Sequence, residues 1–359
     1  MLLKYYLKVR LSYLLKHKNY HYSDCYKGGK MYSQYQGADK KSKCQVYREL
    51  SELCSYWKGY PDSYWRFNMF LKDFNNMEVM KTFIPQCAYG RYARNKEPKY
   101  QILIDDKILF HEIMSLYGLP VPKRFFSYSH GTFKAQGRAI TADEVDDIIA
   151  NITDSRIFVK RNKCGEARGV SAIVRKEDGF YNQRGQKLSA QMILDNHANH
   201  EYLFEQQIEQ DDFVAQFNPD SVNTCRVLTY KNKVIACGLR MGRIGSIVDN
   251  ASCGGIVVNI DIETGKFSDF GLREYDPTKY FEHPDTHITF KDKVLPQWPD
   301  IKMLVEKTSQ MLPYYNSVGF DVACTKEGPV VVEINTGAGA SAPQMGREVG
   351  IAEQFGIHA

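Results

Sequence analysis

The sequence has no long hydrophobic run and no ordered arrangement of cysteines. Its 359 residues contain no stretch of roughly 18 apolar residues, so we expect no transmembrane helix. Residues 1–15 carry charges within their apolar stretch and no small-residue cleavage site, which argues against a signal peptide. Nine cysteines are present without a C-x-x-C pair or nearby histidines at zinc spacing. An odd number without a disulfide framework is typical of reduced thiols, and we therefore expect a cytoplasmic protein.

Several nucleotide-binding and catalytic signatures are also missing. There is no G-x-x-x-x-G-K-[ST] phosphate loop and no dinucleotide-binding glycine fingerprint. We assign no Ser-His-Asp triad and no activated cysteine, and we interpret His111, His283 and His287 as structural. The aromatic-rich segment 45–83 lacks dense interleaving of Lys and Arg, and no recognised nucleic-acid-binding module is visible. We therefore expect no nucleic-acid partner.

What is present is typical of a soluble globular protein with two or three lobes: 43% of the residues are hydrophobic and 25% are charged. The net charge of +5 is uneven, because residues 1–50 carry eleven Lys or Arg against three acidic residues and leave a mildly acidic remainder. Leucines at helical spacing in residues 1–20 predict a basic amphipathic helix. That helix either packs on its own protein, which we favour, or lies on an anionic membrane surface. Residues 21–45 are polar and contain three glycines, so we expect a loose connection there.

The pattern after this connection predicts helices first and then mostly strands. Segment 45–83 has the spacing of helices, and its aromatic residues are expected in a core. A helix that starts at about residue 107 should end at Gly118, and Thr141 with Glu144 forms a capping box for another. The first of these helices is expected to point Leu109, Ile113, Leu116 and Tyr117 inward. Strands are expected at 125–128, 156–160, 171–175, 201–208, 223–230, 234–243 and 256–262, and helices at 189–196 and 300–312.

The stretch 318–341 predicts a hairpin that gathers oxygen ligands. A three-residue loop, 326–328, would pair Thr325 with Pro329 and place Asp321 opposite Glu333. Because side chains alternate along strands, Asp321, Glu333 and Asn335 would lie on one face. Two carboxylates and an amide oxygen suit Mg²⁺, although such residues are more often simply solvated.

Cationic residues lie on other predicted strands. Lys160 ends a strand and precedes a glycine-containing loop, CGEARGV, that could fold over a triphosphate as a flap. Arg226, Arg240 and Arg243 fall on two further strands and could clamp carboxylates or phosphates. The alternative is a surface lysine and surface or salt-bridging arginines.

The order of these elements resembles that of the ATP-grasp ligases over roughly residues 100–350. The resemblance is carried by DDK at 105–107, GLPVPK at 118–123, FVK at 158–160, CGEARGV at 164–170, EQQI at 205–208, GFD at 319–321 and EINTGAG at 333–339. A closer resemblance is to the sugar-transfer associated ATP-grasp branch. It is carried by PDSVNTCRVLTY at 219–230, the run from LRMG to GGI at 239–256 and NTGAGASAPQ at 335–344.

This resemblance implies an α+β, ATP-grasp fold in which two lobes clasp ATP. A mainly helical region, 1–99, would precede a small lobe, 100–204, and a large lobe, 205–359. Lys107 and Lys160 would contact the phosphates, the flap from Gly165 to Gly169 would cover them, and two Mg²⁺ ions would bind Asp321, Glu333 and Asn335. Arg240 would neutralise the transferred phosphate, with Arg226 and Arg243 behind it. Nucleoside contacts are implied for Glu205, Gln206, Gln207 and Ile208, and substrate contacts for Asn250, Gly254, Gly255, Gly337, Gly339 and Ser341.

The implied activity is ligation of a carboxylate to an amine through an acyl phosphate. The resemblance to the sugar-transfer branch implies that an amino acid is joined to a carboxylated sugar in surface polysaccharide synthesis. The alternative is a kinase or other phosphotransferase that forms no amide. Either enzyme would be cytoplasmic, with peripheral contact of residues 1–20 at the inner membrane surface as a further hypothesis.

Overall fold

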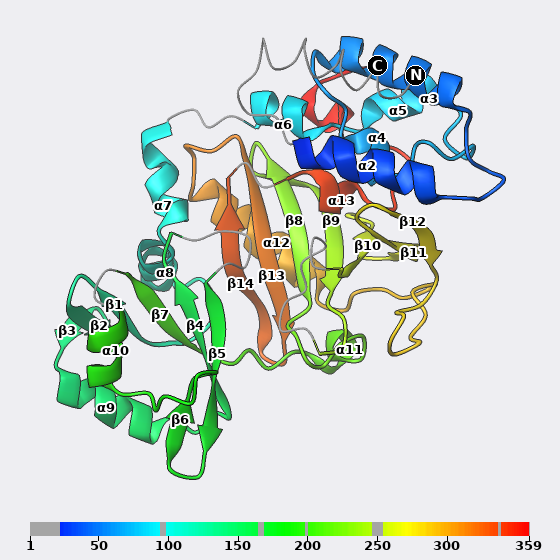
Figure 1. Cartoon of the computed structure of the whole chain (residues 1–359). Helices are drawn as coiled ribbons and strands as arrows, with labels where there is room; N and C mark the ends of the chain where they lie inside the picture. Colours follow the sequence, from blue (N-terminus) through cyan, green and yellow to red (C-terminus); the bar gives the residue numbers. More distant parts are fainter. Residues whose placement is uncertain are drawn as a thin grey trace.

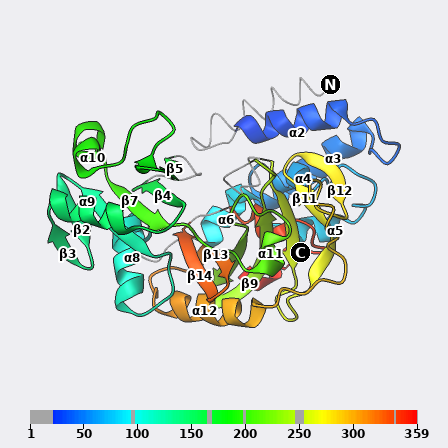
Figure 2. The same ribbon diagram turned by 90° about the horizontal axis from the view of Figure 1, so that it is seen from below.

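The computed structural model describes residues 22–93, 98–163, 169–197, 200–245, 254–336 and 339–358. A helical amino-terminal region is followed by a small lobe and a large lobe, each built on an antiparallel sheet (Figure 1). The two lobes lie side by side in both views (Figures 1 and 2). The predicted basic helix at 1–20 lies outside the described residues. Within them, no helix is both long and apolar enough to cross a membrane.

The helical region has an aromatic core, as the sequence predicts. Trp57, Tyr64 and Trp65 are buried there with other aromatic side chains. The loose connection expected over 21–45 is wrong, because residues 22–34 of this segment form a 13-residue helix. The helix tolerates its glycines because Gly28 lies directly against the ring of Trp65, where a Cβ would be 2.2 Å from Cγ. The helices are α2 (Tyr22–Gln34), α3 (Lys43–Trp57), α4 (Ser63–Arg66), α5 (Met77–Thr82) and α6 (Gln86–Tyr92).

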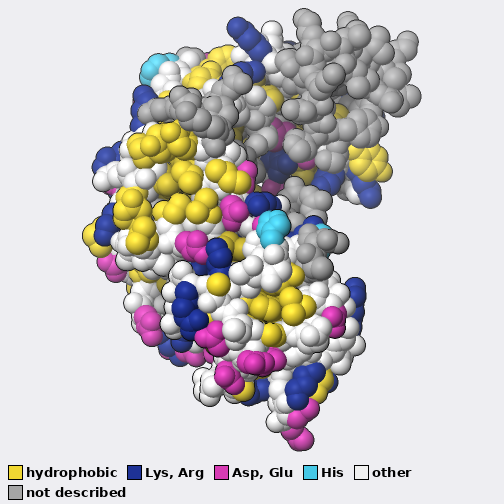
Figure 3. Space-filling view, turned by 90° about the vertical axis from the view of Figure 1, so that its left-hand side faces the viewer, with side chains coloured by type: hydrophobic (Ala, Val, Ile, Leu, Met, Phe, Trp, Pro, Cys, Tyr) yellow, Lys and Arg dark blue, Asp and Glu magenta, His cyan; other side chains and the backbone are white. Residues whose placement is uncertain are grey.

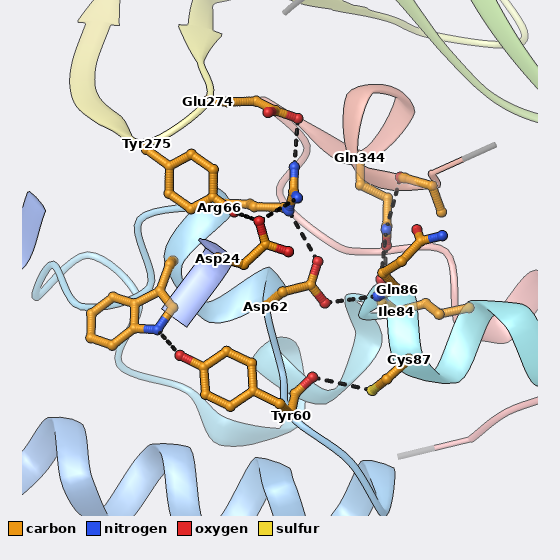
Figure 4. Close-up of polar contacts among 12 residues, drawn as sticks. Asp24, Tyr60, Asp62, Arg66, Ile84, Gln86, Cys87, Glu274, Tyr275 and Gln344 are labelled. Atoms are coloured by element: carbon orange, nitrogen blue, oxygen red, sulfur yellow. Dashed lines mark hydrogen bonds and ion pairs between the residues drawn. The ribbon is translucent and has the colours of Figure 1, made fainter. Parts of the chain in front are cut away.

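A buried ionic cluster fastens the helical region to the large lobe (Figure 4). The guanidinium of Arg66 contacts Asp24 at 3.1 Å, Asp62 at 3.0 Å and Glu274 at 2.6 Å. The hydroxyl of Tyr275 donates to Asp24 at 2.6 Å. Because Glu274 and Tyr275 form the turn between two strands of the large sheet, the helical region is held against that sheet edge.

The small lobe consists of a seven-stranded sheet of order β3-β2-β1-β7-β4-β5-β6 with two helices in its core. The capping box of Thr141 and Glu144 is confirmed. β7, the last strand of this lobe in chain order, lies in the middle of its sheet, so the boundary expected between 204 and 205 falls within a strand. The strands are β1 (Arg124–Ser129), β2 (Thr132–Ala135), β3 (Arg138–Ile140), β4 (Arg156–Arg161), β5 (Val170–Lys176), β6 (Gly179–Tyr181) and β7 (Tyr202–Gln206), and the helices are α9 (Ala142–Asn151) and α10 (Ala190–His197).

The segment that joins the helical region to the small lobe forms η1 (Pro98–Gln101), α7 (Ile102–Asp105) and α8 (Lys107–Leu116). The inward face expected for α8 is wrong. Its buried residues are Phe110, His111 and Met114, whereas Leu116 and Tyr117 are exposed. The helix carries its own apolar residues on several sides, so their spacing in the sequence does not indicate which side packs against the protein. The side of the molecule that carries α7 and α8 shows hydrophobic side chains in its upper part and charged ones mostly below (Figure 3).

The large lobe is a second seven-stranded sheet, of order β12-β11-β10-β9-β8-β13-β14. Helix α12 covers one face, and α13 and the amino-terminal helices lie on the other (Figure 2). The strands are β8 (Thr224–Tyr230), β9 (Lys233–Met241), β10 (Ile256–Ile260), β11 (Phe267–Arg273), β12 (Asp276–Tyr280), β13 (Ser317–Thr325) and β14 (Gly328–Asn335). The helices are α11 (Asp212–Ala215), α12 (Trp298–Gln310), α13 (Ser341–Gln344) and η3 (Glu353–Phe355).

Candidate nucleotide and metal site

The β13–β14 hairpin places Asp321 opposite Glu333 and Gly319 opposite Asn335. The predicted turn is wrong, because Thr325 pairs with Gly328 rather than with Pro329. A register shift next to Asp321 adds one residue to β14 and restores the expected pairing. Asp321, Glu333 and Asn335 therefore share one face of the sheet, as predicted, on the side away from α12.

Two arginines hold Asp321. Arg226, on the adjacent strand, lies 2.7 Å from Asp321 Oδ1 through Nε and donates from Nη2 to Oδ2 at 3.2 Å. Arg240 lies 3.1 Å from Oδ1 and also donates to the hydroxyl of Thr224. Arg243 is not part of this group, because it forms an ion pair with Asp285 at 2.6 Å. The structure thus brings together two of the three predicted arginines.

Two lysines form further ion pairs near this hairpin, one with β14 and one within the small lobe. Lys107 Nζ lies 2.6 Å from Glu333 Oε1, and Lys160 Nζ lies 2.7 Å from Glu205 Oε2. All four side chains line one small cavity of about 20 Å³ together with His111 and seven apolar residues. The cavity is bounded by α8, β4, β7 and β14, so it lies between the two lobes.

The inter-lobe strand β7 presents the predicted nucleoside residues. Glu205 is buried, and the backbone N–H of Gln206 donates to Lys123 O at 2.8 Å. Gln207 and Ile208 follow the strand and are half-buried, and Gln207 accepts a hydrogen bond from Ser155. The chain thus passes from the small lobe to the large lobe directly after β7, at Gln207 and Ile208.

A polar cluster that sequence reasoning missed lies at the base of the predicted flap. The buried Asn162 accepts from the backbone N–H of Lys107 at 2.7 Å and donates to Asp106 at 2.9 Å and Glu201 at 2.7 Å. Lys163 contacts the same two carboxylates at 3.3 and 3.0 Å. Asp106 also caps α8. The only signal in the sequence was the position of Asp106 directly before a predicted helix.

The residues predicted for the flap (Gly165 and Gly169) and for substrate binding are partly described. Gly165, Asn250 and Gly337 lie outside the described residues, and Gly169 pairs through its carbonyl with the N–H of Arg161 at the end of β4. Gly254, with φ of +91°, lies against Arg273, and Gly255 directly precedes β10.

The segment after β14 meets the helical region. A Cβ on Gly339 would lie 3.3 Å from Oε1 of Gln86, which belongs to α6, and 3.4 Å from the hydroxyl of Ser341. Tyr89, also on α6, hydrogen-bonds the hydroxyl of Ser317 at 3.0 Å, and burial raises its pKa to about 12. The helical region therefore lines the predicted substrate end of the hairpin, which sequence reasoning did not indicate.

The oxygen donors fit a hard divalent cation. Asp321 Oδ1 lies within ion-pair distance of two guanidinium groups, so a cation bound here would share this carboxylate with Arg226 and Arg240. No group of three His, Cys, Asp or Glu side chains that could hold a metal occurs in the described part of the chain. Two carboxylates and one amide match Mg²⁺, which takes few protein ligands and fills its shell with water and phosphate oxygens.

Comparison with known proteins places the chain in a family. Solved structures that are similar to it include D-alanine–D-alanine ligase from Bacillus anthracis (13% identity, 71% of this chain and 63% of that chain, TM-score 0.38). Others are the ATP-grasp ligase PsnB with its minimal precursor, Mg and ADP (13%, 68% and 54%, 0.36) and N5-carboxyaminoimidazole ribonucleotide synthetase from Thermotoga maritima (12%, 67% and 44%, 0.36).

The chain spans less than two thirds of the length of each of these structures. A comparison with curated proteins gave no match. The sequence model of one family, described as sugar-transfer associated ATP-grasp, matches residues 90–356. The fold is the ATP-grasp fold, and the chain belongs to the sugar-transfer associated ATP-grasp family.

Proposed function

We propose that the protein is an ATP-dependent ligase that joins a carboxylate to an amine. The single observation that carries this proposal is the pairing of Asp321 with Glu333 on one sheet face, flanked by Arg226 and Arg240 and reached by Lys107. It concentrates oxygen ligands and three cations at one place between two lobes. A transferred phosphoryl group needs such charge neutralisation more than it needs covalent catalysis.

In this proposal the lysines bind the phosphates of ATP. Lys107 and Lys160 exchange their carboxylate partners for phosphate oxygens, which is feasible because neither lysine is fully buried. Glu205 and the backbone of residues 206–208 hold the nucleoside. Asp321, Glu333 and Asn335 would hold two Mg²⁺ ions, which supply Lewis-acid charge neutralisation at the phosphates.

The chemistry follows from the poor electrophilicity of a carboxylate. A carboxylate oxygen of the substrate attacks the γ-phosphorus of ATP, the bond to the β–γ bridging oxygen breaks, and an acyl phosphate and ADP form. The amine then attacks the acyl carbon, phosphate leaves, and the amine loses a proton. Arg240, together with Arg226, lies where it can stabilise negative charge on the transferred group.

For the substrates, we propose an amino acid and a carboxylated sugar of a surface polysaccharide, in keeping with the family to which the chain belongs. The enzyme would act in the cytoplasm, and contact of residues 1–20 with the anionic inner membrane surface is the less favoured alternative to packing on the protein itself. Deleting residues 1–20 and measuring binding to anionic liposomes tests the membrane contact, and undiminished binding would exclude it.

The decisive experiment is hydroxylamine trapping with Mg-ATP and a panel of uronic acids and amino acids. A ligase gives a hydroxamate with hydroxylamine and an amide with the amine, with one ADP released for each. A carboxylate kinase also gives the hydroxamate but no amide, and a sugar hydroxyl kinase gives neither.

Glu333→Gln should abolish both products. The matched control is Glu327→Gln, which changes an exposed carboxylate in the turn of the same hairpin and should keep full activity. If Glu333→Gln kept its activity, the metal and phosphate assignment would be wrong.

A further inference from the structure

A second, larger cavity lies outside the nucleotide site. It has a volume of about 870 Å³ and separates the helical region from the β10–β12 edge of the large sheet. Its walls come from residues 67–83, from residues 259–279 and from the carboxyl-terminal segment 344–349. Small-molecule sites usually have volumes of roughly 300–1,000 Å³. The cavity is thus large enough for an organic ligand.

The walls of this cavity are tied together by direct contacts. Arg66 bridges to Glu274, and the side chain of Asn68 donates to Asp276 O at 3.0 Å. On the other side, Gln344 exchanges two hydrogen bonds of 3.0 Å with the backbone of Ile84 (Figure 4). These contacts cross from the helical region to the large lobe on two sides, so the cavity is preformed rather than a loose gap.

One cation of the lining forms no direct ion pair with a carboxylate of the described residues. Lys266 and Lys279 form ion pairs with Asp292 at 3.6 Å and with Asp73 at 3.1 Å. Arg347, in contrast, is half-buried, and its Nε donates to Val349 O at 3.1 Å. Among the described residues its guanidinium forms no direct ion pair; the carboxylate of Asp261, also in the lining, acts on it at longer range, and burial lowers the pKa of Arg347 more than Asp261 raises it. An anionic group of a ligand would offset this cost of desolvation.

The remaining lining is suited to hydroxyl groups and to the apolar faces of rings. Asp269 and Glu348 are exposed carboxylates with no cation or hydrogen-bond donor from the described side chains. Asn75 adds an exposed carboxamide, and half-buried Phe74 and Phe270 add aromatic surface. Carboxylates accept hydroxyl protons, a carboxamide both donates and accepts, and an aromatic ring packs against C–H groups. A sugar unit that carries one carboxylate presents all the complementary groups.

The position of the cavity relative to Asp321 favours a chain-like ligand. Asp321 pairs with Arg226, Arg226 with Gly238, and Gly238 with the cavity residue Asn259, so these four positions form one row across four strands. Three strand spacings amount to about 14 Å on the same face of the sheet. Helix α13 crosses this row, because a Cβ on Gly238 would lie 2.9 Å from Ala342 O. A single sugar cannot reach both places, so one ligand that serves both must be an oligomer.

We propose that this cavity binds a carboxylated unit of an acidic oligosaccharide, with the guanidinium of Arg347 on the carboxylate, while another unit of the same chain reaches the nucleotide site. The proposal rests on the proposed function, since it assumes that the acidic sugar is the ligase substrate. It adds that the substrate is an oligomer, held at a distance from the reacting group.

Binding without ATP separates this proposal from the ligase assignment. Isothermal titration of the full chain with tetragalacturonate, and with a glucuronate oligosaccharide, should show binding, and neutral maltotetraose should bind at least tenfold more weakly. Arg347→Gln should weaken acidic oligosaccharide binding by about tenfold to a hundredfold, as expected for loss of hydrogen bonds to a charged group. Lys279→Gln, at a cation that already has a carboxylate partner, should change binding less than threefold.

Two further variants keep the outcome interpretable. Asp269→Asn alters an exposed residue, so it should fold and still weaken binding severalfold. Glu333→Gln should keep oligosaccharide binding, since it changes only the nucleotide site. Absence of binding to either acidic oligosaccharide, equal binding of maltotetraose, or unchanged binding by Arg347→Gln would overturn the proposal. Binding as expected, together with no ADP release on any carboxylate and amine, would instead refute the ligase function alone.

Discussion

The side-chain oxygen of Asn162 accepts a hydrogen bond from the backbone N–H of Lys107, with 2.7 Å between the two atoms. Asn162 follows β4, which carries Lys160, whereas Lys107 begins α8. This bond therefore fixes the strand and the helix that supply the two proposed phosphate-binding lysines relative to each other. One buried side-chain amide therefore holds together two segments whose bonded residues lie 55 positions apart in the sequence.

Substitution of this amide should affect both stability and nucleotide binding. Asn162→Ala leaves the N–H of Lys107 without its partner and removes one hydrogen bond each from Asp106 and Glu201, so we expect a loss of about 1–3 kcal/mol in the free energy of unfolding. A displacement of the lysines should also raise the KM for ATP by tenfold or more. Asn151→Ala, at an exposed amide bonded only to Asp147 O, is the control for both measurements. A loss of stability with an unchanged KM would mean that Asn162 does not position the lysines.

Removing the charge of Lys107 should lower kcat/KM strongly while changing the free energy of unfolding only slightly. Lys107→Gln loses an ion pair that is partly open to solvent, and such pairs contribute about 0–1 kcal/mol to stability. The same change removes a phosphate contact, so kcat/KM should fall by about a hundredfold or more. Lys326→Gln, in the exposed turn of the β13–β14 hairpin, should alter neither quantity. Full activity of Lys107→Gln would exclude this lysine from the site.

The sequence indicated that Asp321, Glu333 and Asn335, the proposed metal ligands, share one face, because alternation along a strand is a local property. It did not reveal how the pairing arises: the turn is one residue shorter than predicted, and an irregularity in β14 beside Asp321 compensates. The shorter turn and the extra residue in β14 offset each other, so Glu333 lies opposite Asp321 as predicted. The sequence of the hairpin alone does not reveal the shorter turn or the extra residue in β14, because β13 pairs with β8 as well as with β14.

Contacts between distant segments account for the other differences. Arg243 forms an ion pair with Asp285, 42 positions away in the sequence. Gln86 of the helical region lies against Gly339 of the large lobe. The face of α8 is selected by β7 and β14, which follow much later in the chain. No periodicity within a helix or strand encodes such partners, so residue type could suggest the site but not its complete membership.

The buried histidines predict a fall in stability at mildly acidic pH. Burial lowers the pKa of His111, whose Nε2 lies 2.7 Å from Pro122 O, and that of His283 below their usual 6.5. The unfolded chain therefore takes up protons below pH 6.5 that the folded chain resists, and the stabilisation present above pH 6.5 is lost as the pH falls. In urea unfolding between pH 7 and pH 5, each group should contribute a slope of at most about 1.4 kcal/mol per pH unit.

Replacing both imidazoles should flatten this dependence. The double variant His111→Gln, His283→Gln should lose most of the slope, whatever its absolute stability. Ser115→Ala keeps the imidazole of His111 and removes only a hydroxyl 3.3 Å away, so it should keep the slope. Equal slopes in the wild type and the double variant would show that other groups control the acid response.

Two adjacent glycines in α2 should respond in opposite directions to the same substitution. An added Cβ at Gly28 would lie 2.2 Å from Cγ of Trp65, a buried ring, whereas nothing lies within 4 Å of a Cβ at Gly29. Gly28→Ala must displace the indole or the helix, and overpacking of this kind costs about 1–3 kcal/mol. Gly29→Ala removes only the flexibility of a helical glycine and should stabilise the protein by about 0.5–1 kcal/mol.

Thermal or urea unfolding of the two variants measures this difference directly. The pair tests whether α2 packs on the aromatic core, because helix propensity alone predicts the same gain at both positions. If Gly28→Ala stabilised the protein as much as Gly29→Ala, the helix could not lie against Trp65. In that case residues 21–45 would be the loose connection that their composition suggests, and the contact of Asp24 with Arg66 would have to be abandoned as well.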